Sequence, residues 1–191
     1  MKKPIKTGIA SFDMSGLVFH APLLHANRGF EITSIVERTK EVSRQGYPDS
    51  RLVRSFKELL QDKDIELIIV NTPDQFHYEH TRQAIEAGKH VVVEKPFTQK
   101  YEDACKLIEL AKSKQLVLSV FQNRRWDGDF LSVQKVIKDK MLGRLVVFES
   151  HFDRYRNFIQ ENTWKEQSTS GTGIIYNLGS HLIDQVIVLF G

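Results

Sequence analysis

The sequence predicts an α/β protein, with a doubly wound parallel sheet followed by an incomplete α+β domain. In the first 121 residues, short β-branched runs alternate with segments of helical period. Strands that alternate with helices predict a parallel sheet covered on both faces. Because crossovers between parallel strands are right-handed, the doubly wound arrangement is the default. The alternation stops after Phe121, which indicates a change of domain.

Five runs in the first part are predicted to be strands, because each is short and rich in β-branched residues. They are Ile5–Ser11, Glu31–Glu37, Glu66–Asn71, His90–Glu94 and Leu116–Phe121. Helical patterns separate them. One helix is expected to begin at an Asp74 cap and to end at Gly88, a residue suited to leaving a helix. Another has apolar residues at i, i+3, i+4 and i+7, namely Ala104, Leu107, Ile108 and Ala111.

The rest of the chain is predicted to begin a second domain. A helix around Phe130 is followed by a long strand-like run, Leu145–Tyr155, and the chain closes with an apolar helix, Gly179–Phe190. One strand and a helix cannot complete a sheet, since an isolated strand leaves unpaired edges. We therefore expect residues 1–121 to form one domain and residues 122–191 to form the truncated start of another.

Charge and hydropathy narrow the classes of partner. The 27 Lys and Arg are scattered among 24 Asp and Glu, and the formal net charge is +3, so nucleic acid is not expected as a partner. No segment approaches the ~18–20 apolar residues that span a bilayer, and we expect a cytoplasmic protein without membrane contact. Cys105, the single cysteine, lies in an amphipathic helical pattern and is expected to pack rather than to act as a nucleophile.

The first predicted strand leads into a run where a dinucleotide-binding fold places G-x-G-x-x-G. The run is Ser11, Phe12, Asp13, Met14, Ser15 and Gly16, and only its last residue is glycine. Glycines allow a tight turn and a close approach of the main chain to a pyrophosphate. Asp13 opposes binding, since like charges ~4 Å apart cost roughly 1–4 kcal/mol. Replacing Asp13 by Gly is expected to tighten binding at least about tenfold.

Glu37 ends the second predicted strand, 21 residues beyond Gly16. A carboxylate near that offset can hydrogen-bond the adenosine ribose of NAD. Arg38 beside it is suited instead to the 2′-phosphate of NADP. A solvated Glu–Arg pair at a strand end is the plain structural alternative, and the choice between NAD and NADP stays open.

Several short motifs resemble those of a known family. Glu94-Lys95-Pro96 resembles the E-K-P signature of the glucose-fructose oxidoreductase / inositol dehydrogenase (Gfo/Idh/MocA) family. The further matches, in the family's order, are Asn71-Thr72-Pro73 with His77, Ala87-Gly88-Lys89-His90, Asn123-Arg124-Arg125-Trp126-Asp127 and Leu178-Gly179-Ser180-His181-Leu182-Ile183-Asp184. The resemblance implies a Rossmann-like NAD(P)-binding domain. Family members normally continue into a large, mostly antiparallel sheet.

The resemblance also implies hydride transfer between NAD or NADP and a small-molecule sugar, polyol or related secondary alcohol or carbonyl. Lys95 would then orient the substrate hydroxyl and share its proton, and the Lys95–Pro96 bond is expected to be cis. His181 is the second acid–base position, one helical turn after Asn177. Family dehydrogenases usually carry Asp where Asn177 stands, and an amide cannot take a proton at neutral pH. The alternatives are a strand-end lysine and a core or capping histidine.

Other positions carry over from the family as cofactor contacts. By resemblance they are Asn71, Thr72, Pro73, His77, Glu94 and Lys95. Trp164 would lie in the loop that passes the nicotinamide edge, with Asn123 and Arg124 bordering the same pocket. An aromatic that anchors a loop and ordinary surface polar groups are the alternatives. No metal site is expected, because His77 and His80 lack further ligands at a recognised spacing.

Two functions from different classes remain open. The first is an NAD(P)-dependent oxidoreductase of the family. The second is a nucleotide-binding sensor or inactive remnant, which Asp13, Asn177 and the missing sheet favour. An incomplete second domain would expose apolar side chains such as Val146 and Phe148, so a homo-oligomer is expected.

Overall fold

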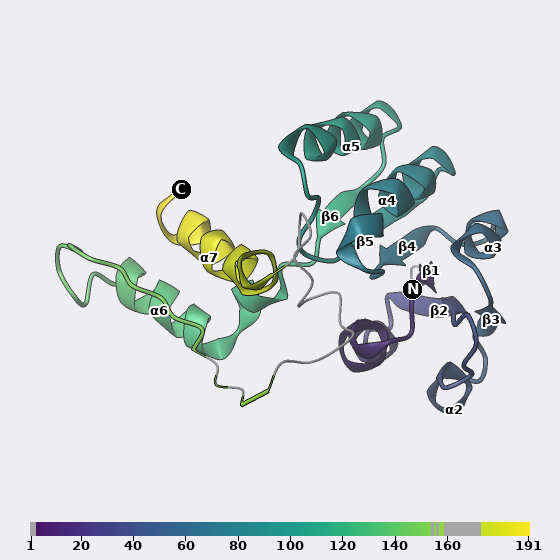
Figure 1. Cartoon of the computed structure of the whole chain (residues 1–191), viewed down its shortest axis with the longest axis horizontal. Helices are drawn as coiled ribbons and strands as arrows, with labels where there is room; N and C mark the ends of the chain where they lie inside the picture. Colours follow the sequence, from purple (N-terminus) through teal and green to yellow (C-terminus); the bar gives the residue numbers. More distant parts are fainter. Residues whose placement is uncertain (1–2, 154, 156, 159–172) are drawn as a thin grey trace. The chain divides into compact units, whose positions relative to one another are not determined.

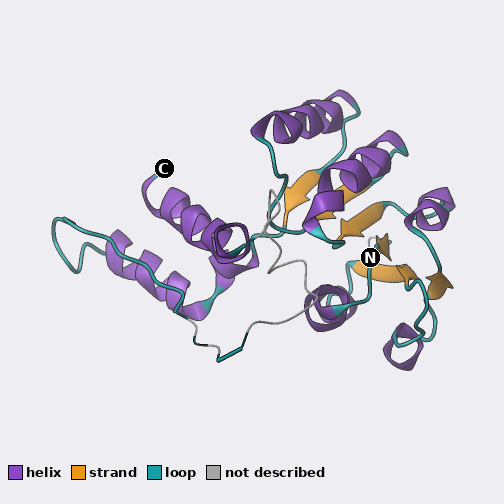
Figure 2. Cartoon of the chain, viewed as in Figure 1, coloured by secondary structure: helices purple, strands orange, loops and turns teal. Residues whose placement is uncertain are grey.

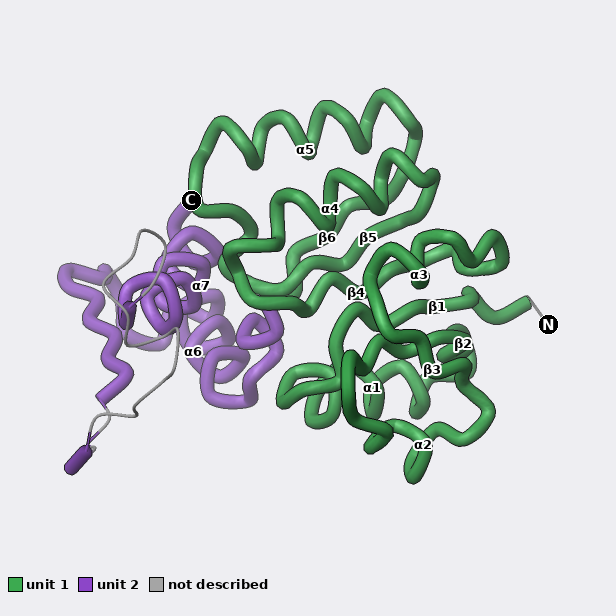
Figure 3. The backbone as a smooth tube through the Cα atoms, turned by 45° about the vertical axis from the view of Figure 1, so that its right-hand side comes forward, with its two compact units in different colours: residues 1–121 green, residues 122–191 purple. Residues whose placement is uncertain are grey.

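The computed structural model describes residues 3–153, 155, 157–158 and 173–191. The chain forms two compact units, Met1–Phe121 and Gln122–Gly191, which Figure 3 colours separately. The division falls directly after the last strand of the sheet, β6 (Leu118–Val120). That the first unit binds a dinucleotide and the second binds substrate stays a prediction.

A six-stranded parallel sheet forms the centre of the first unit (Figure 1). In the order β3-β2-β1-β4-β5-β6, the strands are β3 (Arg51–Val53), β2 (Phe30–Val36), β1 (Ile5–Ile9), β4 (Leu67–Val70), β5 (His90–Val93) and β6. The predicted doubly wound parallel sheet is confirmed, and the five predicted strands lie within two residues of their expected bounds. β3 was not among those five predictions, since three residues are too few to show a period of two.

Helices cover both faces of this sheet (Figure 2). They are η1 (Gly16–His20), α1 (Ala21–Ala26), α2 (Ser43–Gly46), α3 (Phe56–Gln61), η2 (Asp74–Phe76), α4 (His77–Glu86) and α5 (Tyr101–Ser113). The expected helix from Asp74 to Gly88 is present, but it starts as the 3₁₀ turn η2 before becoming α4, and its N-cap residue is Pro73, so the expected Asp74 cap is wrong. Gly88 leaves the helix with φ +77°, a conformation that favours glycine.

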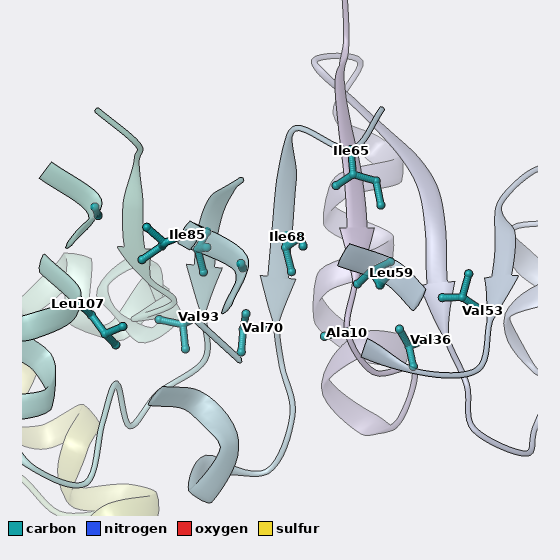
Figure 4. Close-up of a cluster of buried hydrophobic side chains, with 13 residues drawn as sticks. Ala10, Val36, Val53, Leu59, Ile65, Ile68, Val70, Ile85, Val93 and Leu107 are labelled. Carbon is teal, nitrogen blue, oxygen red and sulfur yellow. The ribbon is translucent and has the colours of Figure 1, made fainter. Parts of the chain in front are cut away.

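The sheet separates two hydrophobic cores, because successive side chains of a strand point to opposite faces. On β4, Ile68 and Val70 join the cluster beneath α3, α4 and α5 (Figure 4), while Leu67 and Ile69 join the cluster beneath α1. Burial on both faces explains why β4 is an uninterrupted apolar run rather than an alternating one.

The strand order creates a crevice at one edge of the sheet. From β1 the chain proceeds to β2 and β3, and then crosses to β4 on the other side of β1. Ile9 of β1 pairs with Ile35 of β2 and Ile69 of β4, so these three strands end at the same level. Ligands of open α/β sheets bind at such a switch point, beyond the carboxyl ends of the strands.

The regular elements in the described part of the second unit are all helices. It contains η3 (Asn123–Trp126), α6 (Gly128–Lys138), η5 (Ile175–Gly179) and α7 (Ser180–Phe190). Helices were expected where α6 and α7 occur, but the expected strand Leu145–Tyr155 is wrong: residues 145–153 and 155 form no regular structure. A strand needs a neighbour for its main-chain hydrogen bonds, and the described residues of this unit include no other strand. Every helix in the described part of the chain is too short or too polar to cross a membrane.

Candidate functional site

The loop between β1 and η1 brings two main-chain segments into close contact at Gly16. A β-carbon at residue 16 would overlap the main-chain oxygen of Ser11 and would lie 3.1 Å from Nδ2 of Asn71. Residue 16 therefore has to be glycine for this turn to form. The one glycine that this loop retains is the one that close packing of helix on strand requires.

Asn71 fastens the same loop to the end of β4. Its Oδ1 accepts a hydrogen bond from the Ser11 N–H at 2.9 Å. Its Nδ2 donates to the Ser11 carbonyl at 2.8 Å and to Ser15 Oγ at 3.3 Å. Asn71 is buried, so its amide holds the main chain of the loop in shape.

Asp13 extends from this loop with a counter-charge beside it. Lys40 Nζ lies 3.5 Å from one carboxylate oxygen, and Ser11 Oγ lies 3.3 Å from the other. Both charged side chains are largely exposed, at 73% for Asp13 and 67% for Lys40. Lys40 therefore offsets part of the negative charge beside the predicted phosphate position, although solvent weakens a pair as open as this one.

A cavity of about 450 Å³ lies beyond the ends of β1, β2 and β4. The predicted site residues that line it are Ser11, Phe12, Asp13, Glu37, Arg38, Thr72 and Pro73. It is also lined by residues that were not predicted as cofactor contacts, including Thr39, Lys40, Arg54, Phe56, Phe76 and His80. The predicted residues outside this lining are Met14, Ser15, Gly16, Asn71, His77, Glu94 and Lys95 within the first unit. Phe12 belongs mainly to the core, where its ring meets the Tyr47 ring edge-on at 5.8 Å.

Glu37 turns its carboxylate away from solvent and into the start of α2. One oxygen accepts from the Val42 N–H at 3.0 Å. The other accepts from the N–H and the hydroxyl of Ser43, at 2.9 and 2.5 Å. With three donors on its two oxygens, this buried carboxylate is committed to holding the loop after β2.

Arg54, directly after β3, holds the same loop from the other side. Its Nη1 donates to the carbonyls of Glu37 and Lys40, at 3.1 and 2.7 Å, and its Nη2 forms an ion pair with Glu41. A basic side chain at a strand end is the sequence feature that points to Arg54, and β3, with three residues, is too short to show a strand pattern.

His80 forms part of an aromatic wall of the cavity. Its ring stacks on Phe56, with centroids 4.1 Å apart, and on Phe76 at 5.5 Å. Its Nδ1 lies 3.1 Å from Thr72 Oγ1. Burial lowers the pKa of His80, which favours the neutral ring at physiological pH.

Glu94 and Lys95 follow β5 at a second position on the same sheet edge. Glu94 is nearly buried, and its carboxylate lies 2.9 Å from Nε2 of His20 and accepts from the Lys95 N–H at 3.2 Å. The Lys95–Pro96 bond is cis, as expected. Glu94 thus acts on the main chain of Lys95, and His20 from η1 holds Glu94.

His77, predicted as a cofactor contact, has a different place in the structure. Its side chain is 2% exposed, with Nδ1 2.7 Å from the Pro96 carbonyl and Nε2 2.8 Å from the Thr72 carbonyl. Both ring nitrogens are engaged by main-chain oxygens, so the ring has no nitrogen left for a ligand. It joins the loop after β4 to the loop after β5.

The remaining predicted residues belong to the second unit. Asn177 lies in η5, and His181, four residues later, lies in α7 with its ring edge-on to Phe152 at 6.5 Å. Arg124 in η3 places its guanidinium 5.2 Å from the centre of the same Phe152 ring. The other predicted residue of η3 is Asn123. Trp164 lies outside the described residues.

Two family models match the chain in succession. The model of an oxidoreductase family with an NAD-binding Rossmann fold matches residues 5–122, and the Gfo/Idh/MocA C-terminal domain matches residues 130–191. The chain belongs to the Gfo/Idh/MocA family. The Rossmann-like NAD(P)-binding domain that the motifs implied for the first unit is therefore confirmed.

Relatives of this Gfo/Idh/MocA chain include proteins from bacteria and yeast. A scyllo-inositol 2-dehydrogenase (NADP(+)) of Bacillus subtilis is 45% identical over 98% of the chain, and an uncharacterized oxidoreductase of Schizosaccharomyces pombe is 48% identical over 98%. A solved structure described as an oxidoreductase from Bacteroides fragilis is 57% identical, with a TM-score of 0.88 over 99% of the chain and 52% of that structure. The chain spans about half the length of the curated relatives it matches, 52% in both cases.

Proposed function

We propose that the protein is an NADP-dependent oxidoreductase acting on a secondary alcohol or carbonyl of a sugar, polyol or cyclitol. The arrangement of charged side chains in the loop after β2 supports this proposal. Glu37, the residue placed to bind the ribose of NAD, has both carboxylate oxygens turned into α2, while Arg38 and Lys40 line the cavity. Two cations at this position suit a 2′-phosphate.

The residues present fit a dinucleotide. Gly16 leaves room for a close approach of the main chain, and the cavity beyond β1, β2 and β4 has a cationic side at Arg38 and Lys40. The aromatic wall that includes His80 offers a flat surface suited to the adenine ring. The Bacillus subtilis relative bears the name of an NADP(+) enzyme acting on an inositol, which supports this cofactor and this substrate class.

The proposed chemistry assigns roles that the family resemblance implies. The cofactor, when bound, supplies or accepts the hydride. Lys95 orients the substrate hydroxyl and holds or releases its proton at Nζ. His181 is the second proton-handling group, and the Asn177 amide binds a substrate hydroxyl without taking a proton.

Fluorescence titration with NADPH and NADH tests the cofactor assignment. NADPH is expected to bind at least about tenfold more tightly, because its 2′-phosphate adds a charge-assisted contact. Arg38→Ala should weaken NADPH binding and leave NADH binding unchanged, whereas Lys40→Ala should weaken both and NADPH more, because Lys40 also offsets the Asp13 carboxylate beside the phosphates that the two cofactors share. Arg44→Ala is the matched control, since Arg44 pairs with Glu41 and does not line the cavity. Equal or tighter binding of NADH would refute the NADP assignment.

A second candidate function is cofactor binding without turnover, as in a sensor. Asn177, where family dehydrogenases usually carry Asp, favours it. Incubation with NADP⁺ and a panel of inositols, sugars and polyols separates the two, because an enzyme forms NADPH while a sensor binds the dinucleotide alone. A small polar substrate and a dinucleotide cofactor fit a cytoplasmic location, which we propose as well.

A further inference from the structure

Arg54 lines the cavity, and the sheet fixes its place beside the loop after β2. Val53 of β3 pairs with Val36 of β2, and the Val53 carbonyl accepts a hydrogen bond from the Glu37 N–H at 3.0 Å. The Arg54 N–H in turn donates to a carboxylate oxygen of Glu58 in α3 at 2.8 Å. Residue 54 therefore leaves the sheet beside residue 37, at the edge where the dinucleotide is proposed to bind.

The guanidinium of Arg54 is bonded to the main chain of that loop. Nη1 carries two hydrogens and donates to two carbonyls, those of Glu37 at 3.1 Å and Lys40 at 2.7 Å. Nη2 forms an ion pair with Glu41. A guanidinium is charged at every pH that a folded protein meets, so these contacts need no particular protonation state of Arg54. Both hydrogens of Nη1 serve the loop, which leaves none of them for a nucleotide.

The loop is held on two sides, and the residues that line the cavity lie between the attachments. The Glu37 carboxylate accepts from the N–H groups of Val42 and Ser43, while Arg54 binds the carbonyls of residues 37 and 40. Residues 38–40 line the cavity. If this stretch had to be ordered when a ligand binds, the ordering would cost part of the binding free energy. Arg54 provides the attachment on the carbonyl side.

The bond to Lys40 also affects the loop after β1. Lys40 Nζ lies 3.5 Å from the carboxylate of Asp13, and Arg54 holds the carbonyl of the same lysine. Without Arg54, the main chain of Lys40 could move, and its ammonium group would move with it. The cation would then leave both the proposed 2′-phosphate position and Asp13.

We propose that Arg54 is a positioning residue that determines the selectivity for NADP(H) over NAD(H). By binding the carbonyls of Glu37 and Lys40, it fixes the main chain from which the side chains of Arg38 and Lys40 reach the 2′-phosphate. Arg54 acts through the loop and does not bind the phosphate itself. The proposal rests on the NADP-dependent function proposed above, and it adds a residue from the end of another strand.

Fluorescence titrations with NADPH and NADH test this role without turnover, because the ratio of the two affinities measures selectivity. In Arg54→Met, the ratio should fall about fivefold or more, since lost hydrogen bonds leave the loop to be ordered by the ligand. NADH affinity should change less than NADPH affinity. Arg51→Met is the matched control: Arg51 lies in β3, contacts Glu58 at 3.7 Å and does not line the cavity. An unchanged ratio in Arg54→Met would overturn the proposal.

Arg54→Lys separates positioning from a direct effect of charge. Lysine keeps a positive charge beside the cavity, but its single ammonium group cannot replace the planar fork that joins two carbonyls and the Glu41 carboxylate. If Arg54 acts through the loop, the ratio should fall nearly as far in Arg54→Lys as in Arg54→Met. A ratio equal to that of the parent chain would show that charge alone suffices, and the positioning role would be wrong.

Hydrogen exchange measured by mass spectrometry reports on the loop with no nucleotide present. In Arg54→Met, exchange should become about fivefold faster or more over residues 37–44 and stay unchanged over Leu67–Val70 of β4. Equal exchange over residues 37–44 in the variant and the parent would contradict the proposal. Equal affinities of the unaltered chain for NADPH and NADH would refute the NADP assignment instead, and exchange would still decide whether Arg54 holds the loop.

Nuclear magnetic resonance of the unaltered chain covers the case in which the variants fail to fold. With ¹⁵N-labelled arginine, rotation about the Cζ–Nη1 bond of Arg54 should be slow, because both hydrogens of Nη1 are bonded to carbonyls. The more exposed Arg51 is the reference within the same chain. Rotation as fast in Arg54 as in Arg51 would show that the guanidinium does not hold the loop.

Discussion

At the residue scale, the loop after β1 shows how one position can be dictated by main-chain contacts and another by charge. Gly16 has no room for a side chain, because the Ser11 carbonyl occupies the space. Asp13, three residues earlier, is exposed and makes its closest charged contact with Lys40. The lack of space at Gly16 is a geometric requirement. The effect of the Asp13 charge on a bound phosphate is electrostatic, so salt and substitution can change it.

Gly16→Ala should weaken dinucleotide binding at least about tenfold, since displacing the loop by even a fraction of an ångström costs its phosphate contacts well over 1 kcal/mol. Fluorescence titration with NADPH measures the change. Gly46→Ala in α2 is the control, because a β-carbon there meets nothing within 4 Å. Full NADPH affinity in Gly16→Ala would show that the loop adapts and that the glycine is dispensable.

Asp13→Asn should tighten NADPH binding by up to about fivefold at low salt, which corresponds to the ~0.2–1 kcal/mol typical of exposed charge pairs. The sequence predicted at least about tenfold for Asp13→Gly, and the structure lowers the estimate because Lys40 already offsets the carboxylate. Asn keeps the size of the side chain and avoids the added backbone freedom of Gly. Titrations at two salt concentrations check it, since the gain should shrink as screening increases. Identical affinities at low salt would mean that Asp13 faces away from the phosphates.

At the scale of elements, the connection from α3 to β4 is held by a lysine from the turn between α4 and β5. Lys89 is 7% exposed, and its Nζ donates to the carbonyls of Asp62, Lys63 and Ile65, at 2.9, 3.4 and 2.6 Å. These three carbonyls lie in the connection after α3, outside the helix itself. Burial lowers the pKa of Lys89. Its ammonium group has three donors, and each of the three carbonyls accepts a hydrogen bond from it.

Lys89→Met should therefore lower the free energy of unfolding by roughly 2–4 kcal/mol, because it keeps the apolar stem and leaves buried carbonyls without a donor. Urea denaturation measures the loss. Lys114→Met, at the exposed end of α5, is the matched control and should change stability by less than about 0.5 kcal/mol. A Lys89→Met chain as stable as the control would mean that water replaces the lysine.

At the scale of the whole molecule, the second unit exposes an apolar helix face. On α7, Ile183 and Ile187 are 57% and 60% exposed and lie four residues apart, on one side of the helix. Contiguous apolar surface of this kind favours association, and the homo-oligomer expected from the sequence stays a prediction.

We predict that the chain self-associates with rising concentration, and that the double variant Ile183→Ser, Ile187→Ser reduces this association at least severalfold. Size-exclusion chromatography with light scattering measures the mass. Val117→Ser, at a 61% exposed apolar position in the first unit, is the control. A monomer at every concentration of the unaltered chain would rule out the association.

Local patterns in the sequence determined the elements of the first unit, because the apolar pattern of a few consecutive residues indicates a strand or a helix. The period of apolar residues located α5, the apolar run located β4, and Gly16 and Lys95 were identifiable from short motifs. The strand expected over Leu145–Tyr155 failed because strand formation depends on a neighbour as well as on composition.

The direction in which each polar side chain turns was decided only by the tertiary structure. Glu37 occupies the expected place in the sequence, yet its carboxylate binds α2, which favours NADP over NAD in our proposal. Arg54 and His77 acquire their roles from partners that the parallel sheet brings close, and the contact of Asn71 with Ser11 joins residues 60 positions apart. Periodicity records which face of an element is apolar, and it carries no information about which polar groups meet when strands from distant parts of the chain end at one edge.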